Sequence, residues 1–299
     1  MLLLPQGHNV TAAVTLIDRS VTYSDKGTAA LGPFPRGTDG GDGGSLAVVP
    51  VGYWSYAISP SLAVGVGFGP TFGNKTEYEE EFIGRFSGYF AEIKQINVNP
   101  SIAYRVNDTV SLGFGINFAK NETEFRQSAP VIPLGAERDA RLKGDDTAMG
   151  WNVGALFQVS PSTRLGVTYR SKIKFDLKGK QTIDGVLNAD IKAELETPDS
   201  ASFALHHQLN DKWDLLADLT WTGWSSIDQI RVEGGTNPVL DYNFKDTWRV
   251  GIGAGYQMND KWKLRFGVAW DEAPVRSAAD RTMTLPDSDR TWLALGARY

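Results

Sequence analysis

The sequence predicts an all-β fold: a transmembrane antiparallel β-barrel of about twelve strands, formed by residues 1–299 as a single barrel domain. Three observations carry this prediction. Apolar and polar residues alternate along many segments, tight turns alternate with long connections, and the composition includes 32 Gly, 9 Trp, 10 Tyr and 14 Phe. Small residues suit a lumen and aromatic residues suit the two membrane interfaces. No stretch approaches the ~18 consecutive apolar residues of a transmembrane helix, so strands would have to cross the membrane.

Alternation with a period of two is clearest in residues 164–177, 247–256 and 261–271. Almost every second residue there is apolar and mostly large, and the residues between are glycine, polar or charged. A helix would spread these charges around its circumference, whereas a strand places them on one side. A soluble barrel or sandwich also alternates, but here the second face is rich in glycine and in both charge signs, as expected of a wet lumen.

The connections alternate between short and long. Tight turns are predicted at Ser59-Pro60-Ser61, Asn107-Asp108, Ser160-Pro161-Ser162, Asn210-Asp211 and Asn259-Asp260. Long external loops are predicted near residues 24–44, 75–88, 127–146, 178–198, 233–243 and 272–288. Short periplasmic turns at one rim and long loops at the other are typical of bacterial outer-membrane barrels.

Composition and motifs exclude several functions. The net charge of -5 argues against a nucleic-acid partner, and the absence of cysteine excludes disulfides and thiolate metal sites. No motif for a metal or a cofactor occurs. Histidine occurs only at His8, His206 and His207; the last two fall on opposite faces of one strand, without a serine elbow. We therefore expect no catalytic residue and no enzyme. A general porin is a further alternative, but open porins need about sixteen strands.

Particular segments resemble a known family. Residues 165–179, the segment Thr222-Gly223-Trp224-Ser225-Ser226 in a predicted strand, and above all residues 244–296 are similar to the FadL/TodX (OMPP1) family of outer-membrane long-chain fatty acid and hydrocarbon transporters. The resemblance implies a monomeric barrel of about fourteen strands, plugged by an N-terminal hatch and surrounded by outer-membrane lipid and lipopolysaccharide.

The chain departs from that pattern at both ends. It begins near His8, where the first barrel strand is expected, so we expect the hatch and the signal peptide to be absent. It ends at Tyr299 in the expected twelfth strand, so two strands of the family barrel would be missing. A closed twelve-stranded barrel is the alternative, because unpaired edges in lipid are costly.

The function implied by the resemblance is passive uptake of a hydrophobic small molecule, in the first place a long-chain fatty acid. Uptake of an aromatic hydrocarbon is the alternative within the family. A fatty acid needs an apolar groove for its tail and a cation for its carboxylate, and the planar guanidinium of arginine can hold both carboxylate oxygens.

Candidate ligand-binding residues follow from these needs. Alternation places Arg290 and Trp292 on the inward face of the last strand. The resemblance implies that Arg290 and Arg231 lie near the ligand head group. The phase of Arg231 requires a bulge, because Ile227 and Ile230 break the alternation.

Two further groups of charged residues are considered for the lumen. The resemblance implies a third basic position near residues 120–126, where Lys120, Glu122 and Arg126 remain open. Further arginines predicted in the lumen are expected to pair with aspartates: Arg105, Arg170, Arg249 and Arg265, with Asp176, Asp218 and Asp271 as partners.

A lateral gate is predicted in the third strand, at Phe68, Gly69, Pro70, Thr71, Phe72 and Gly73. Proline cannot donate a ladder hydrogen bond and glycine weakens a strand. The resemblance implies a kink here that opens a lateral hole to the membrane; the alternative is a bulge without a role in transport.

Apolar residues also occur in predicted external loops. The resemblance implies that such loops capture the substrate first; the alternative is that they only cap the barrel mouth. The residues concerned are Val131, Ile132, Leu134, Ile183, Val186 and Leu187. The acidic residues 77–81 are expected to form a solvated loop.

Overall fold

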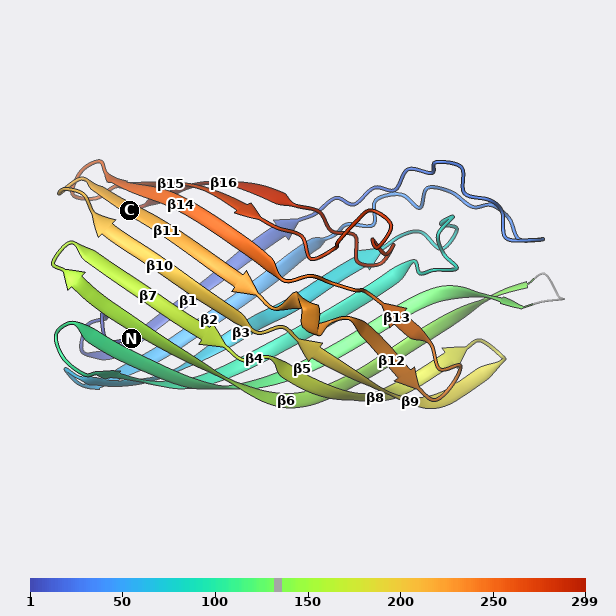
Figure 1. The fold of residues 1–299 in the computed structure, drawn as a ribbon, viewed down its shortest axis with the longest axis horizontal. Helices are drawn as coiled ribbons and strands as arrows, with labels where there is room; N and C mark the ends of the chain where they lie inside the picture. Colours follow the sequence, from blue (N-terminus) through green and yellow to red (C-terminus); the bar gives the residue numbers. More distant parts are fainter. Residues whose placement is uncertain (132–135) are drawn as a thin grey trace.

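The computed structural model describes residues 1–131 and 136–299 and confirms the predicted all-β barrel fold. Twelve strands follow one another around the wall, each antiparallel to its neighbours (Figure 1). They are β1 (Gly7–Asp18), β2 (Leu46–Ser59), β3 (Leu62–Glu77), β4 (Phe90–Arg105), β5 (Val110–Val131), β6 (Ala136–Ser160), β7 (Thr163–Arg170), β10 (Ser200–Gln208), β11 (Trp213–Thr222), β14 (Thr247–Gln257), β15 (Lys263–Asp271) and β16 (Arg290–Arg298). No helix in the described part of the chain is long and apolar enough to cross a membrane.

Four further strands and one helical turn lie off this path and extend the wall away from the tight turns. They are β8 (Ile173–Ile183), β9 (Leu187–Thr197), β12 (Gln229–Glu233), β13 (Val239–Asp241) and the 3₁₀ helix η1 (Trp224–Ser226). β8 follows β7 after two residues and, like β7, pairs with β6. Figure 1 shows both chain ends and the tight turns at one end of the barrel and the long hairpins at the other.

The predicted external loops at residues 127–146 and 178–198 are therefore wrong in detail, because they contain long paired strands, and the loop at residues 233–243 contains only the short strand β13. Their polar character comes from one exposed face alone. Lys174 pairs across the hairpin with Glu194, while Leu177 and Ile191 are buried on the other face. A strand that leaves the membrane keeps its period of two, so a charged outer face does not end it.

The outward faces of the strands form the membrane belt. On β5, Phe114, Ile116 and Phe118 are 45%, 39% and 44% exposed, whereas Asn117 on the opposite face is completely buried. The next outward residue is Lys120. The change from large apolar residues to charge marks the level at which β5 leaves the hydrocarbon.

β1 and β16 form the two edges of the sheet. The described residues of these strands make no backbone ladder with each other. The outward residues Leu293 and Leu295 of β16 are 84% and 85% exposed. The alternative of a closed twelve-stranded ring is therefore not observed in the part of the chain that the structure describes.

Arg85 ties the external connections together. Its Nε and Nη2 atoms contact the two carboxylate oxygens of Glu137 at 2.6 and 2.7 Å, and Nη2 also donates to the carbonyl of Pro35 at 2.7 Å. Nη1 donates to the carbonyl of Phe82 at 3.1 Å. One buried guanidinium thus joins the β1–β2 connection, the β3–β4 connection and the start of β6.

Replacing this arginine should loosen the connections without unfolding the barrel. We expect Arg85→Ala to lower the local unfolding free energy by about 2–3 kcal/mol, because Glu137 and two carbonyls lose a charged donor. Hydrogen exchange of residues 31–41 and 78–88 measures the effect. Lys75→Ala, which removes an exposed ion pair with Glu77, is the control. It should change the local unfolding free energy obtained from exchange by less than about 0.5 kcal/mol. Equal exchange in the two variants would contradict the assignment.

Candidate ligand-binding site

A cavity of about 660 Å³ lies among the external segments, within the roughly 300–1,000 Å³ typical of ligand pockets. Most of its wall is apolar. The main apolar lining residues are Phe72, Ile93, Leu195, Trp224, Ile227, Ile230, Tyr242, Phe244 and Leu285. We call this cavity the chamber.

Aromatic rings build one wall of the chamber. The ring of Trp224 lies 5.5 Å from that of Phe72 and 6.1 Å from that of Phe244 between centroids, and Tyr242 lies 5.3 Å from Phe244. Burial raises the pKa of the Tyr242 hydroxyl, so this wall stays neutral.

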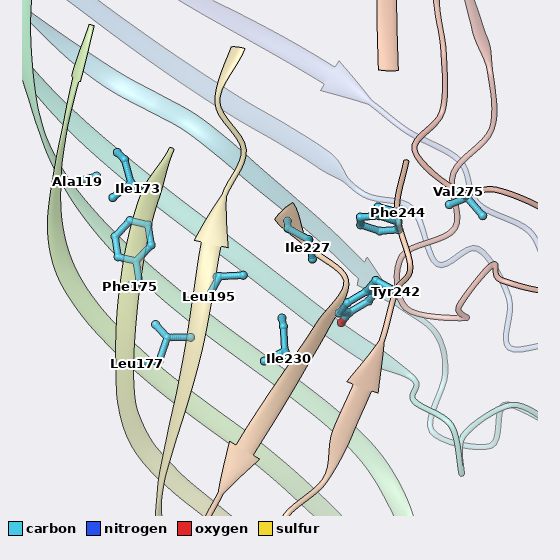
Figure 2. Close-up of a cluster of buried hydrophobic side chains, with 10 residues drawn as sticks. All are labelled: Ala119, Ile173, Phe175, Leu177, Leu195, Ile227, Ile230, Tyr242, Phe244 and Val275. Atoms are coloured by element: carbon cyan, nitrogen blue, oxygen red, sulfur yellow. The ribbon is translucent and has the colours of Figure 1, made fainter. Parts of the chain in front are cut away.

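The 3₁₀ turn η1 explains how these rings reach the interior. Trp224 was expected in a strand, and that expectation is wrong because the chain turns through η1 after β11. Figure 2 shows Ile227 and Ile230 beside Leu195 of β9, gathered with Tyr242 and Phe244 in one buried cluster. The turn, and not the predicted bulge, accounts for the broken alternation.

Four charged side chains also line the chamber. Arg19, Arg281, Asp287 and Arg290 belong to its lining. Arg290 Nη2 lies 3.0 Å from Asp271 Oδ2, and Nη1 lies 3.6 Å from Asp287 Oδ1. Burial raises the pKa of Asp287, although Arg290 acts in the opposite direction. A cavity whose lining combines apolar residues with guanidinium groups can hold an amphipathic anion.

The predicted ligand-binding residues separate in the structure. Arg290 pairs with Asp271 in the ladder and reaches the chamber. Trp292 is on the same face of β16 but lines a different cavity. Arg231 is exposed, because Ile230 and Val232 occupy the buried face of β12. Arg231 is not among the residues that line the chamber.

The third basic position is also absent from the chamber. Ala119, Asn121 and Thr123 are buried on one face of β5, whereas Lys120 and Glu122 are exposed on the other face, where they form an ion pair at 2.7 Å. Arg126 is on the same outer face and contacts Glu124 at 2.7 Å. Sequence reasoning missed three charged residues of the chamber lining: Arg19, Arg281 and Asp287. All three lie outside strands, where alternation cannot predict which way a side chain points.

An opening in backbone pairing lies between β2 and β3. Their ladder runs from Ser59–Leu62 to Gly52–Phe68 and stops there, although both strands continue. Beyond that point residues 46–51 pair with β1 only and residues 69–77 pair with β4 only. The wall therefore lacks a hydrogen-bonded ladder at the level of the predicted gate.

A bulge at Thr71 changes which face of β3 points inward. Gly69 pairs with Asn97 and Phe72 pairs with Gln95, and the two β4 partners are both buried in the lumen. Residues three positions apart normally face opposite sides of a strand. The extra residue, held by a 2.9 Å hydrogen bond from Gln95 Nε2 to Thr71 Oγ1, directs Phe72 into the chamber.

A second cavity of about 380 Å³ adjoins this opening. Its lining includes residues 65–71 of β3, Val51 of β2 and lumen residues of β4. Thr71 lines both this cavity and the chamber. We call the second cavity the exit cavity.

Comparison with known proteins identifies the family. The family model described as "Outer membrane protein transport protein (OMPP1/FadL/TodX)" matches residues 1–299, the whole chain. The chain belongs to this family. It is an outer-membrane β-barrel of a family that transports hydrophobic molecules and consists of transporters and channels, not enzymes.

Individual relatives agree with this membership. The long-chain fatty acid transport protein of Salmonella typhi is 26% identical over 332 residues, which cover 96% of this chain and 76% of that protein. The crystal structure of a Pseudomonas aeruginosa FadL homologue gives a TM-score of 0.83 at 26% identity, covering 97% of this chain and 76% of the other. The Ralstonia pickettii toluene transporter TbuX gives a TM-score of 0.70 at 21% identity, covering 91% and 79%; it supports the fold alone.

The predicted capture residues of this FadL/TodX family member lie at two hairpin tips. Val131 ends β5, and Ile183, Val186 and Leu187 form the tip between β8 and β9, with Val186 61% exposed. Ile183 pairs with Ala140 of β6, so the second tip adjoins the first hairpin. Ile132 and Leu134 lie outside the described residues. None of the other capture residues lines the chamber.

The lumen arginines differ in whether they form the predicted ion pairs with aspartates. Arg249 pairs with Asp218, as predicted. Asp271 pairs instead with Arg290. Arg170 donates to the side-chain oxygen of Asn117 at 2.6 Å, so the expected aspartate partner is wrong for this residue.

Asp287 should compete with an anionic ligand for Arg290. We expect Asp287→Asn to strengthen binding of an alkyl sulfonate about threefold to tenfold, or about 1 kcal/mol. The raised pKa of Asp287 also fixes the sign for the native protein. As pH falls through that pKa the competing charge disappears, so binding strengthens, and the variant should lose this dependence. The sulfonate stays ionised throughout. Asp280→Asn, in the same connection but outside the chamber lining, is the control; an unchanged pH profile in Asp287→Asn would refute the competition.

Proposed function

We propose that this protein takes up long-chain fatty acids passively and releases them sideways into the outer membrane. The observation that carries the proposal is the chamber, which combines an aromatic and aliphatic wall with Arg19, Arg281 and Arg290. The wall suits an alkyl tail, and the guanidinium groups suit a carboxylate.

The charged residues of the chamber lining favour an acid over a neutral hydrocarbon. Three arginines and one aspartate line the cavity, so an entering carboxylate meets an excess of positive charge. A neutral ligand would leave these groups without an added partner and would gain nothing from them. The name of the Salmonella typhi relative is consistent with a fatty acid. Uptake of an aromatic hydrocarbon is the second candidate, since the aromatic wall fits such a ligand and a structural neighbour is named a toluene transporter.

The proposed path uses three places in order. The hairpin tips at Val131 and Val186 offer apolar side chains where the substrate arrives from outside. The chamber then holds it, and the opening between β2 and β3 near Thr71 is the way out. Lateral release makes physical sense, because the alkyl tail passes from the chamber into lipid without exposure to water.

The surroundings of the barrel belong to the same proposal. In this proposal the protein is a monomer surrounded by outer-membrane lipid. The outward belt on β5 contacts the lipid tails. The exposed residues Lys94 and Lys120 lie beyond this belt and contact the anionic head groups of lipopolysaccharide.

Calorimetry of the refolded protein in detergent tests the function. The proposal expects saturable binding of oleate at one site and weaker binding of toluene. Toluene binding without oleate binding would replace the fatty acid by an aromatic hydrocarbon. Binding of neither ligand, together with steady ion conductance in planar bilayers, would overturn the transporter in favour of a porin.

A further inference from the structure

Arg170 is a lumen cation that lines the exit cavity. It is the last residue of β7 and pairs in the ladder with Asn152 of β6. Its Nη1 atom donates to Asn117 Oδ1 at 2.6 Å. Among the described residues no aspartate or glutamate lies within ion-pair distance of it, whereas Arg249 and Arg290 both have such partners. A partly desolvated guanidinium without a counter-ion is unfavourable unless something else compensates it.

Amide groups crowd around this cation. Asn97 Nδ2 donates to Asn117 Oδ1 at 2.9 Å and Asn99 Nδ2 donates to the same oxygen at 3.1 Å. With Arg170, three donors converge on one amide oxygen, which has two lone pairs. Asn117 is fully buried and Asn97 is 4% exposed. Asn99 Nδ2 also lies 2.7 Å from Asn152 Oδ1, so this amide has an acceptor of its own, and the donor in excess among the described residues is the guanidinium of Arg170, which bonds Asn117 through Nη1 only.

The position of the cluster connects it with the exit. Arg170, Asn97 and Asn99 line the exit cavity together with residues 65–71 of β3. The same cavity reaches Thr71, which also lines the chamber. A molecule that leaves the chamber past the bulge therefore meets Arg170 beside the opening between β2 and β3.

We propose that Arg170, with Asn97 and Asn99, forms a second anion site that holds the carboxylate of a departing fatty acid while its tail enters the opening. This inference rests on the proposed function. An entering carboxylate supplies an acceptor for the N–H groups of Arg170 that do not bond Asn117, and it neutralises the guanidinium. The chamber selects and holds the acid at Arg290, and the second site gives its head group a partner below the bulge. Neutral molecules pass without using it.

Flux measurements in proteoliposomes test the site with a charged and an uncharged substrate. In Arg170→Gln we expect the flux of oleate to fall about tenfold while the flux of methyl oleate stays within about twofold of the native value. Oleate affinity measured at the chamber should be unchanged. Arg170→Lys should recover most of the oleate flux. An equal fall for acid and ester would mean a structural role only, and an unchanged oleate flux would also overturn the proposal.

A second variant changes the cluster without changing its charge. A Cβ atom on Gly115 would lie 2.8 Å from Asn99 Nδ2 and 2.9 Å from Asn152 Oδ1, so Gly115→Ala displaces the amides. It should reduce oleate flux selectively, as Arg170→Gln does, and loss of both fluxes would count against the site. Heat-modifiable gel migration verifies the barrel in each variant. If the native protein carries neither oleate nor its ester, the proposed function fails; if it carries both and Arg170→Gln behaves as native, this inference alone fails.

Discussion

A disulfide between positions 51 and 69 should stop uptake. The β2–β3 ladder ends at Gly52–Phe68, so Val51 and Gly69 are the next residues across the opening. A Cβ atom on Gly69 would lie 3.4 Å from the Cβ atom of Val51, close to the roughly 3.5–4.5 Å of disulfides. The chain has no cysteine, so the Val51→Cys, Gly69→Cys double variant can form this bond alone. We expect the oxidised protein to lose uptake of oleate by about tenfold or more, because β2 and β3 can no longer separate.

The reduced form of the same variant is the control. It contains both substitutions and differs only in the bond, so recovery of uptake on reduction assigns the loss to closure of the opening. Oleate binding to the chamber should persist in the oxidised form. If oxidised and reduced proteins take up oleate at the same rate, ligand does not leave between β2 and β3.

Loss of Arg290 should have the next largest effect. We expect Arg290→Gln to weaken oleate binding about 10- to 100-fold, the range for removal of a charged hydrogen-bond partner in a partly buried site. The same change removes the ion pairs of Asp271 and Asp287. The two unpaired carboxylates then repel the carboxylate of oleate, which adds to the loss of affinity. Calorimetry with oleate and with methyl oleate measures it.

Arg265→Gln is the matched control for this variant. Arg265 also faces the lumen, but it lines a different cavity. Its substitution should leave oleate affinity within about twofold. An equal loss in the two variants would indicate a general effect of lumen charge, and an equal loss for acid and ester in Arg290→Gln would exclude a carboxylate contact.

The sequence predicted what depends on alternation. β16 is a regular strand, so the inward face of Arg290 and Trp292 follows from a period of two, and the ladder places them opposite Asp271 and Ala269. The tight turns follow from side-chain chemistry: Asn107 accepts two backbone N–H bonds, as Asn210 and Asn259 do.

Other features could not be predicted because they depend on three-dimensional context. The 3₁₀ turn at Trp224 resets the phase before Arg231, which ends on the exposed face. Pro70 marks an irregularity, but only pairing with β4 identifies Thr71 as the extra residue. The partner of Arg170 depends on the neighbouring strands, which bring amides and not aspartates to it.

Photo-cross-linking tests most directly whether a hydrophobic ligand occupies the chamber. A long-chain fatty acid with a diazirine at its methyl end would be irradiated with the native protein, and the modified residues would be located by mass spectrometry. The account predicts labels at Phe72, Trp224, Ile227 or Phe244, suppressed by excess oleate. Labels confined to the outward belt at Phe114 and Phe118, or labels that excess oleate does not suppress, would contradict it.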